Sequence, residues 1–224
     1  MLTNTEKKFS IVFFIIVLFE LITANTETLQ TAHYIAKPAI VISLIVLFIK
    51  TSHSLKKSIK TLTLLALIFS LLGDVLLMFV NQSPHFFTVG LVAFLIAHIM
   101  YIVVFLKHKN KSKSALEFLV LLLIYASGLF YLLKDGLGDM LTPVIIYMIV
   151  ILSMATTAFL RKDIVNSLSY KLVFIGAIFF MISDSILALN KFYQPIPLSN
   201  ISIMVTYALA QYLIVIGVLK LKED

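Results

Sequence analysis

The sequence predicts an all-α membrane protein with about eight transmembrane helices, and two observations lead to this prediction. Of the 224 residues, 61% are hydrophobic and only 13% are charged, whereas a soluble domain carries about 25% charged residues. The hydrophobic residues also gather in runs long enough to cross a bilayer as helices. Because such a chain cannot cover a water-soluble surface, we expect a single transmembrane domain over residues 1–224.

The first predicted span follows two lysines. Lys7 and Lys8 precede an apolar run at 9–24, a pattern that also occurs in signal peptides. This run contains Glu20 and lacks a clear small-residue cleavage site, so we expect a retained first helix.

Seven further apolar runs follow, each long enough for a helix that crosses the bilayer. The second and sixth spans contain Pro38 and Pro143, and the third and seventh contain Asp74 and Asp184. No linker rich in Gly or Ser separates them, so no second domain is expected. We expect these spans at 34–49, 61–80, 85–106, 115–133, 141–160, 171–190 and 200–219.

Basic residues mark one side of the membrane. The second, fourth and sixth connections and the two chain ends hold 15 of the 18 Lys and Arg residues, whereas Lys134 and Lys191 lie on the other side and Lys37 lies within a span. Because cytoplasmic loops are enriched in Lys and Arg, we expect both termini in the cytoplasm. The 15 residues are Lys7, Lys8, Lys50, Lys56, Lys57, Lys60, Lys107, Lys109, Lys111, Lys113, Arg161, Lys162, Lys171, Lys220 and Lys222.

The same distribution explains the net charge of +7. Nucleic-acid binding would need the basic residues on one water-exposed face, and here they lie between apolar runs. We therefore expect membrane lipids, and no nucleic acid, as partners. We also expect the chain to lie in the plasma membrane, which in a bacterium is the inner membrane.

A weak internal repeat relates the two halves of the chain. The segments FSLLGDVLL at 69–77 and FFMISDSIL at 179–187 share a Phe, a small residue before an Asp, and a Leu after it. Ala97-His98 and Ala210-Gln211 follow at similar offsets. This pattern favours two parallel four-helix halves.

Polar side chains within the predicted spans are few. A charged residue inside the bilayer is costly and should have a partner or a function. These residues are Glu20, Lys37, Asp74, His98 and Asp184, supported by Ser70, Tyr101, Tyr147, Ser183, Tyr207 and Gln211.

The depth of these residues follows from the basic residue at the cytoplasmic end of each span. Lys37, Asp74 and Asp184 lie 13, 14 and 13 residues from that end, or about 20 Å along a helix. His98 and Gln211 lie nine residues from Lys107 and Lys220. They are therefore expected closer to the middle of the bilayer than Lys37 and the two aspartates. We expect a polar pocket that opens outward, with the two carboxyl groups within roughly 10 Å of each other.

Structural explanations exist for several of these residues. In a purely structural interpretation, Lys37 forms a salt bridge with one aspartate, and His98 is an interhelical hydrogen-bonding group. A metal site is not expected, because the chain has 0 Cys and catalytic zinc usually has three protein ligands. No cofactor is expected either.

In this order the motifs resemble the YhhN-like family of membrane lysoplasmalogenases. The resemblance spans most of the chain, although the first and fifth spans add little to it and Glu20 matches no motif. It implies hydrolysis of the vinyl-ether bond of a lysoplasmalogen to a fatty aldehyde and a glycerophospho-amine, with Asp74 and Asp184 as catalytic residues. It rests on Lys37-Pro38, SLLGD at 70–74, Phe87, Gly90, Phe94, Ala97-His98, Tyr101, GAIFFMISDSILAL at 176–189, Phe192, Tyr207, Ala210-Gln211 and Gly217.

The chemistry of the residues fits this implication. Two interacting carboxylates in an apolar pocket tend to share one proton, so one aspartate acts as the acid while the other stabilises a cation or activates water. Which aspartate is the acid stays open, as does whether Lys37 binds the substrate phosphate or holds one aspartate ionised. The expected substrate-binding residues are Lys37, His98, Tyr101, Ser183, Tyr207 and Gln211.

Two alternatives to a hydrolase follow from the same features. A proton-coupled transporter also uses paired halves and carboxylates within the membrane, although 7 Gly residues leave little sign of broken helices. A lipid-binding or scaffold protein would need the aspartates only for stability.

Overall fold

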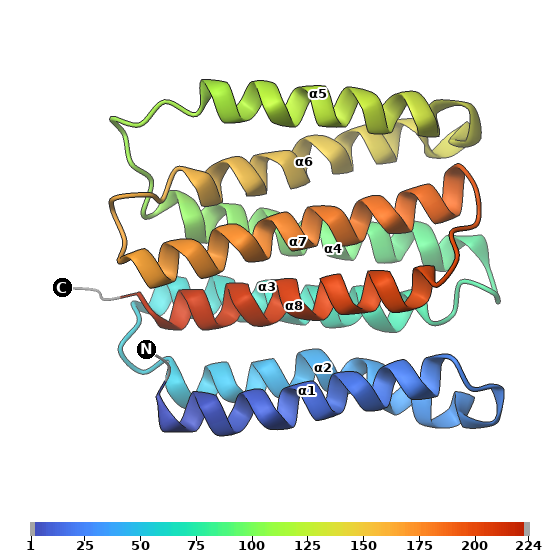
Figure 1. The fold of residues 1–224 in the computed structure, drawn as a ribbon, viewed down its shortest axis with the longest axis horizontal. Helices are drawn as coiled ribbons and strands as arrows, with labels where there is room; N and C mark the ends of the chain where they lie inside the picture. Colours follow the sequence, from blue (N-terminus) through green and yellow to red (C-terminus); the bar gives the residue numbers. More distant parts are fainter. Residues whose placement is uncertain (1–2, 222–224) are drawn as a thin grey trace. The chain divides into compact units, whose positions relative to one another are not determined.

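The computed structural model describes residues 3–221 and consists of α-helices joined by short connections (Figure 1). No strand occurs among these residues, which confirms the all-α fold class. Lys222, one of the basic residues at the C-terminal end, lies outside the described residues. The helices are α1 (Asn4–Ala24), α2 (Gln30–Thr51), α3 (Lys57–Leu77), α4 (Pro84–Leu106), α5 (Leu116–Leu133), α6 (Leu141–Phe159), α7 (Ser167–Phe192) and α8 (Ser199–Leu219).

Seven of the described helices, α2 to α8, are long and apolar enough to cross a membrane. The first helix, α1, has 21 residues but carries Glu6, Lys7 and Lys8 near one end and Glu20 near the other. These charges set it apart from the other seven. The prediction of a polytopic membrane protein is confirmed, with seven helices that qualify as spans and an eighth, more charged helix before them.

Local capping explains two helix starts, those of α7 and α1, that precede the predicted bounds. The α7 helix begins at Ser167, one turn before the predicted 171–190, because the Asn166 side chain accepts a hydrogen bond of 2.9 Å from the backbone N–H of Ser169. At the start of α1, Thr3 and Glu6 form a capping box.

The described residues form two compact units, and each is considered by itself. Unit 1 comprises residues 3–100 and unit 2 comprises residues 101–221, so the border lies within α4. The repeat in the sequence favours halves of four helices each; the observed border divides the fourth helix instead of following it.

In unit 1, α1 packs against α2 and α2 packs against α3. The interior is apolar and includes Phe13, Ile40, Leu44 and Phe48, which are fully buried. Burial of large aliphatic and aromatic side chains of this kind is worth about 1.5–3 kcal/mol each when the reference is water. At the end of the unit where α2 begins, the Tyr34 ring stacks on Phe79 with centroids 5.6 Å apart.

In unit 2, α7 and α8 pack closely along their length because glycines remove side chains from the contact. A Cβ atom at Gly176 would lie 2.8 Å from Cγ1 of Ile214, and one at Gly217 would lie 2.7 Å from Cγ2 of Val173. The α5 helix is different, since its buried residues are Leu122 and Leu133. Unit 2 thus holds one pair of tightly fixed helices and one loosely packed helix.

Candidate functional site

A side-chain hydrogen bond joins Asp184, on α7, to α6. The Tyr147 hydroxyl, on α6, donates a hydrogen bond of 2.6 Å to Oδ2 of Asp184, on α7. A hydroxyl–carboxylate bond of this length is typical of a charge-assisted interaction, which is stronger than a neutral one. Tyr147 therefore fixes both the position and the electrostatic surroundings of one predicted catalytic aspartate.

A second group of polar side chains lies between α4 and α8. The Tyr101 hydroxyl donates a hydrogen bond of 2.8 Å to Oε1 of Gln211, and Nε2 of Gln211 donates one of 3.4 Å to the Tyr207 hydroxyl. All three side chains are buried. Three of the predicted substrate-binding residues are thus brought together.

The two groups lie on neighbouring helices of unit 2, because α7 packs against both α6 and α8. The Phe180 ring, on α7, packs edge-on against Tyr207, on α8, with centroids 5.5 Å apart. We call Tyr101, Tyr147, Asp184, Tyr207 and Gln211 the unit 2 polar cluster. It combines a carboxylate, hydroxyl groups and an amide in an apolar surrounding, where hydrogen bonds and charges act more strongly than in water.

Ser183 lies beside this cluster in sequence but has another contact. Its hydroxyl donates a hydrogen bond of 3.0 Å to the backbone carbonyl of Ile203, on α8. The small side chain before Asp184 therefore links two helices. Its predicted role in substrate binding stays a prediction.

In unit 1, Asp74 is almost completely buried on α3. The residue before it, Gly73, lies against Phe94 of α4, where an added Cβ atom would be 2.6 Å from the ring. A small residue before the aspartate thus allows close contact with the following helix, as Ser183 does in unit 2. His98, also on α4, is fully buried.

Lys37 lies half-buried on α2. Within the described part of unit 1 it forms no ion pair with a carboxylate within 4.0 Å, so the interpretation of Lys37 as a salt-bridge partner gains no support there. It does interact electrostatically with Glu20 and His33. Lys37 therefore interacts at long range with an acidic and an imidazole side chain but forms no ion pair with Glu20.

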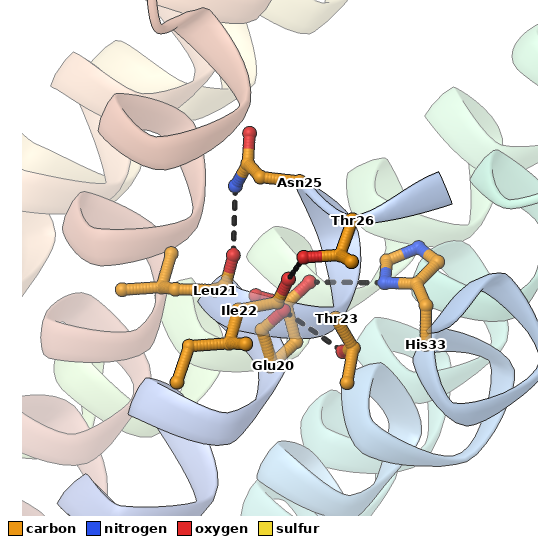
Figure 2. Close-up of polar contacts among 7 residues, drawn as sticks. All are labelled: Glu20, Leu21, Ile22, Thr23, Asn25, Thr26 and His33. Atoms are coloured by element: carbon orange, nitrogen blue, oxygen red, sulfur yellow. Dashed lines mark hydrogen bonds and ion pairs between the residues drawn. The ribbon is translucent and has the colours of Figure 1, made fainter. Parts of the chain in front are cut away.

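Glu20 and His33 form a contact between α1 and α2, shown in Figure 2. Oε1 of Glu20 lies 3.4 Å from Nδ1 of His33, and Glu20 is 1% exposed. His33 lies just before the predicted span at 34–49, and its contact with Glu20 was not predicted. The signal that was present is the spacing of His33 and Lys37, four residues apart, which puts both on one face of a helix.

Among residues 3–221, no group of three or more His, Asp or Glu side chains is arranged to hold a metal ion. The site residues are carboxylates, hydroxyls, one amide, one imidazole and one ammonium. Such a set can donate and accept protons and can bind a charged head group, which are the tasks of acid–base catalysis on a lipid.

Comparison with known proteins gives relatives that carry the name of an enzyme. The chain is 33% identical over 158 residues to human "Lysoplasmalogenase TMEM86B", which covers 69% of this chain and 62% of the relative. It is 32% identical over 162 residues to human "Lysoplasmalogenase TMEM86A", which covers 70% of this chain and 65% of the relative. The bovine "Lysoplasmalogenase TMEM86A" is 30% identical over 162 residues, with the same coverage.

The chain thus spans somewhat less than two thirds of the length of these relatives. No solved structure matches it. The profile of the YhhN family matches residues 32–218, which include Asp74 and Asp184, and the chain therefore belongs to the YhhN family.

Proposed function

We propose that this chain is a membrane hydrolase that cleaves the vinyl-ether bond of a lysoplasmalogen, or of a related lyso-ether lipid, with Asp74 and Asp184. The products are a fatty aldehyde and a glycerophospho-amine. The observation that carries the proposal is the 2.6 Å hydrogen bond between the buried Tyr147 and the half-buried Asp184, in a chain whose relatives are named lysoplasmalogenases.

The reaction needs an acid, an anion and water. Hydrolysis of an enol ether begins with protonation of the alkene carbon remote from oxygen, which leaves an oxocarbenium ion. Water then adds to the carbon next to oxygen, and the resulting hemiacetal releases the glycerol alcohol. Paired carboxylates perform the corresponding tasks in glycosidases, where one acts as the acid and the other stabilises the cation or activates water.

The structure supports a division of roles between the two aspartates. A hydrogen bond donated to a carboxylate favours its ionised form, and Tyr147 donates such a bond to Asp184. We therefore assign Asp184 as the anion that stabilises the oxocarbenium ion and activates water. Asp74 is then the acid that protonates carbon.

The remaining predicted residues have supporting roles in this proposal. Tyr101, Tyr207 and Gln211 orient the substrate beside Asp184, and the buried His98 contributes to the polar surroundings of the site. Lys37 binds the substrate phosphate, because it is a cation without an ion pair in the described part of unit 1. The substrate is a lysophospholipid that reaches the site from the membrane, and the basic connections support cytoplasmic termini in the plasma membrane, the inner membrane of a bacterium.

The transporter alternative finds less support in the helices. Carriers of this kind build their sites from discontinuous helices. The α2 helix runs from Gln30 to Thr51 through Pro38 without a break, and α6 likewise continues through Pro143. Continuous helices fit an enzyme with a fixed site better than a carrier.

The proposal is tested with the purified protein and lysoplasmenyl-ethanolamine, by measuring aldehyde release. The alkyl-ether lipid with the same head group serves as the control, because it lacks the double bond that is protonated. Aldehyde from the vinyl-ether lipid alone is the expected result. No aldehyde from a folded, membrane-inserted protein would contradict the proposal and favour a transporter or a scaffold.

A further inference from the structure

Glu20, on α1, and Lys37, on α2, carry opposite charges and interact electrostatically. They form no ion pair within 4.0 Å, and Glu20 contacts His33 instead. No carboxylate in the described part of unit 1 therefore pairs with Lys37 within that distance.

Glu20 retains an unused acceptor. Its Oε1 atom contacts His33, whereas its Oε2 atom is buried and has no hydrogen-bond partner among the described residues. The nearby Thr23 hydroxyl does not supply one, because it donates to the backbone carbonyl of Glu20 at 3.0 Å (Figure 2). A buried carboxylate oxygen without a donor is costly. A ligand that donates a hydrogen bond and carries positive charge would remove this cost.

His33 contacts the other oxygen of this carboxylate, Oε1. His33 and Lys37 lie on one face of α2, since they are four residues apart. The imidazole contacts Oε1, so Oε2 is the oxygen of Glu20 that lacks a hydrogen-bond donor. The cluster thus contains one buried acceptor without a donor and one half-buried cation without an ion pair, on adjacent helices.

These groups lie at the depth expected for the reaction site. Glu20 lies 12 residues beyond Lys8 in the sequence, or about 18 Å along a helix, close to the depth of Lys37. In unit 1, α2 packs against both α1 and α3, and α3 carries Asp74. The cluster and the proposed acid therefore belong to neighbouring helices of the same unit.

We infer that Glu20 binds the primary ammonium group of a zwitterionic lipid head group whose phosphate is bound by Lys37. The inference rests on the proposed function and adds a specificity to it. An ethanolamine ammonium can donate a hydrogen bond to Oε2, whereas the quaternary ammonium of choline has no N–H to donate. Glu20 accordingly selects ethanolamine over choline lyso-lipids. It lies outside residues 32–218, so this selection does not depend on a residue in the family match.

The test compares head groups in wild-type protein and in Glu20→Gln, with Glu27→Gln as the matched control because Glu27 is an exposed carboxylate in the following turn. Alkyl-ether lyso-lipids with ethanolamine or choline head groups serve as probes that cannot be cleaved. Binding is measured by titration in detergent micelles. Wild type and Glu27→Gln should bind the ethanolamine lipid roughly tenfold more tightly, the range of a hydrogen bond to a charged group, and Glu20→Gln should lose this preference.

Equal affinity for the two head groups in the wild type, or an unchanged preference in Glu20→Gln, would overturn the inference. If Glu20→Gln does not fold, the wild-type comparison and Glu20→Asp, which keeps the charge and should keep the preference, decide it. Aldehyde release is measured separately. A preference that depends on Glu20 without any aldehyde from vinyl-ether lipids would refute the proposed function and leave the head-group site standing, whereas aldehyde release without the preference would refute only the site.

Discussion

The Tyr147 hydroxyl donates a 2.6 Å hydrogen bond to Asp184, and this bond joins α6 to α7 within unit 2. A phenol that donates a hydrogen bond to a carboxylate stabilises negative charge there. This bond is the reason for proposing Asp184 as the ionised aspartate of the pair.

The first prediction concerns Tyr147→Phe. Loss of the donor should lower kcat roughly tenfold to hundredfold, since a hydrogen bond to a charged group is removed from the site. In the Asp184→Asn background the same change should have little further effect, because the two residues act as a unit. The control is Tyr125→Phe, since the Tyr125 hydroxyl donates a bond of equal length, 2.6 Å, to Ser185 outside the polar cluster. Equal losses in both Phe variants would contradict a specific role.

The aspartates themselves are tested by Asp74→Asn and Asp184→Asn. Each should lower turnover at least roughly 100-fold, the lower end for loss of a positioned acid or base, while the protein still inserts and purifies. The measurement is initial rate of aldehyde release with size-exclusion profiles in parallel. Variants that lose folding instead of turnover would favour the scaffold alternative.

The position of the solvent proton provides a test that does not depend on variants. A carboxylic acid that protonates the alkene carbon leaves one solvent hydrogen on carbon 2 of the aldehyde. In heavy water, with the aldehyde reduced at once to prevent exchange, the product should carry a single deuterium at carbon 2, detected by mass spectrometry. Product without this deuterium, under efficient trapping, would rule out protonation on carbon.

The packing of α7 on α8 predicts a contrast between two glycines. In Gly217→Ala the new Cβ atom would lie 2.7 Å from Val173 Cγ2 and 2.9 Å from the Val173 backbone nitrogen, and overpacking of this kind costs about 1–3 kcal/mol. Gly128→Ala, in α5, meets nothing within 4 Å and should be neutral or slightly stabilising. Thermal unfolding in one detergent compares the two. A Gly217→Ala protein as stable as wild type would show that α8 can move away at no cost.

The sequence predicted the helical membrane fold because long apolar runs and clustered lysines are local signals. It also grouped Tyr101, Tyr207 and Gln211, since helical spacing and depth depend only on residue number. It did not pair Glu20 with His33, because that contact depends on how α1 and α2 are rotated about their axes. Periodicity alone does not determine such a rotation when most faces of a helix are apolar.

Arg161 shows the same limit in the connection between α6 and α7. As a basic residue in a connection it was expected to mark a water-facing loop, but its side chain is fully buried. One guanidinium nitrogen donates a 3.0 Å hydrogen bond to Ser169, and the group lies over the Phe105 ring at 5.4 Å. Burial lowers its pKa to about 10. Its burial follows from tertiary contacts that a count of charges does not contain.

The loose packing of α5 makes this helix a practical place for a spectroscopic label. The chain has 0 Cys, so a single cysteine introduced at an exposed α5 position would be the only thiol to react with a maleimide dye. Gly128 is such a position, because an added side chain there has open space around it. A fluorophore on α5 would report on the surrounding lipid while leaving the unit 2 polar cluster unmodified.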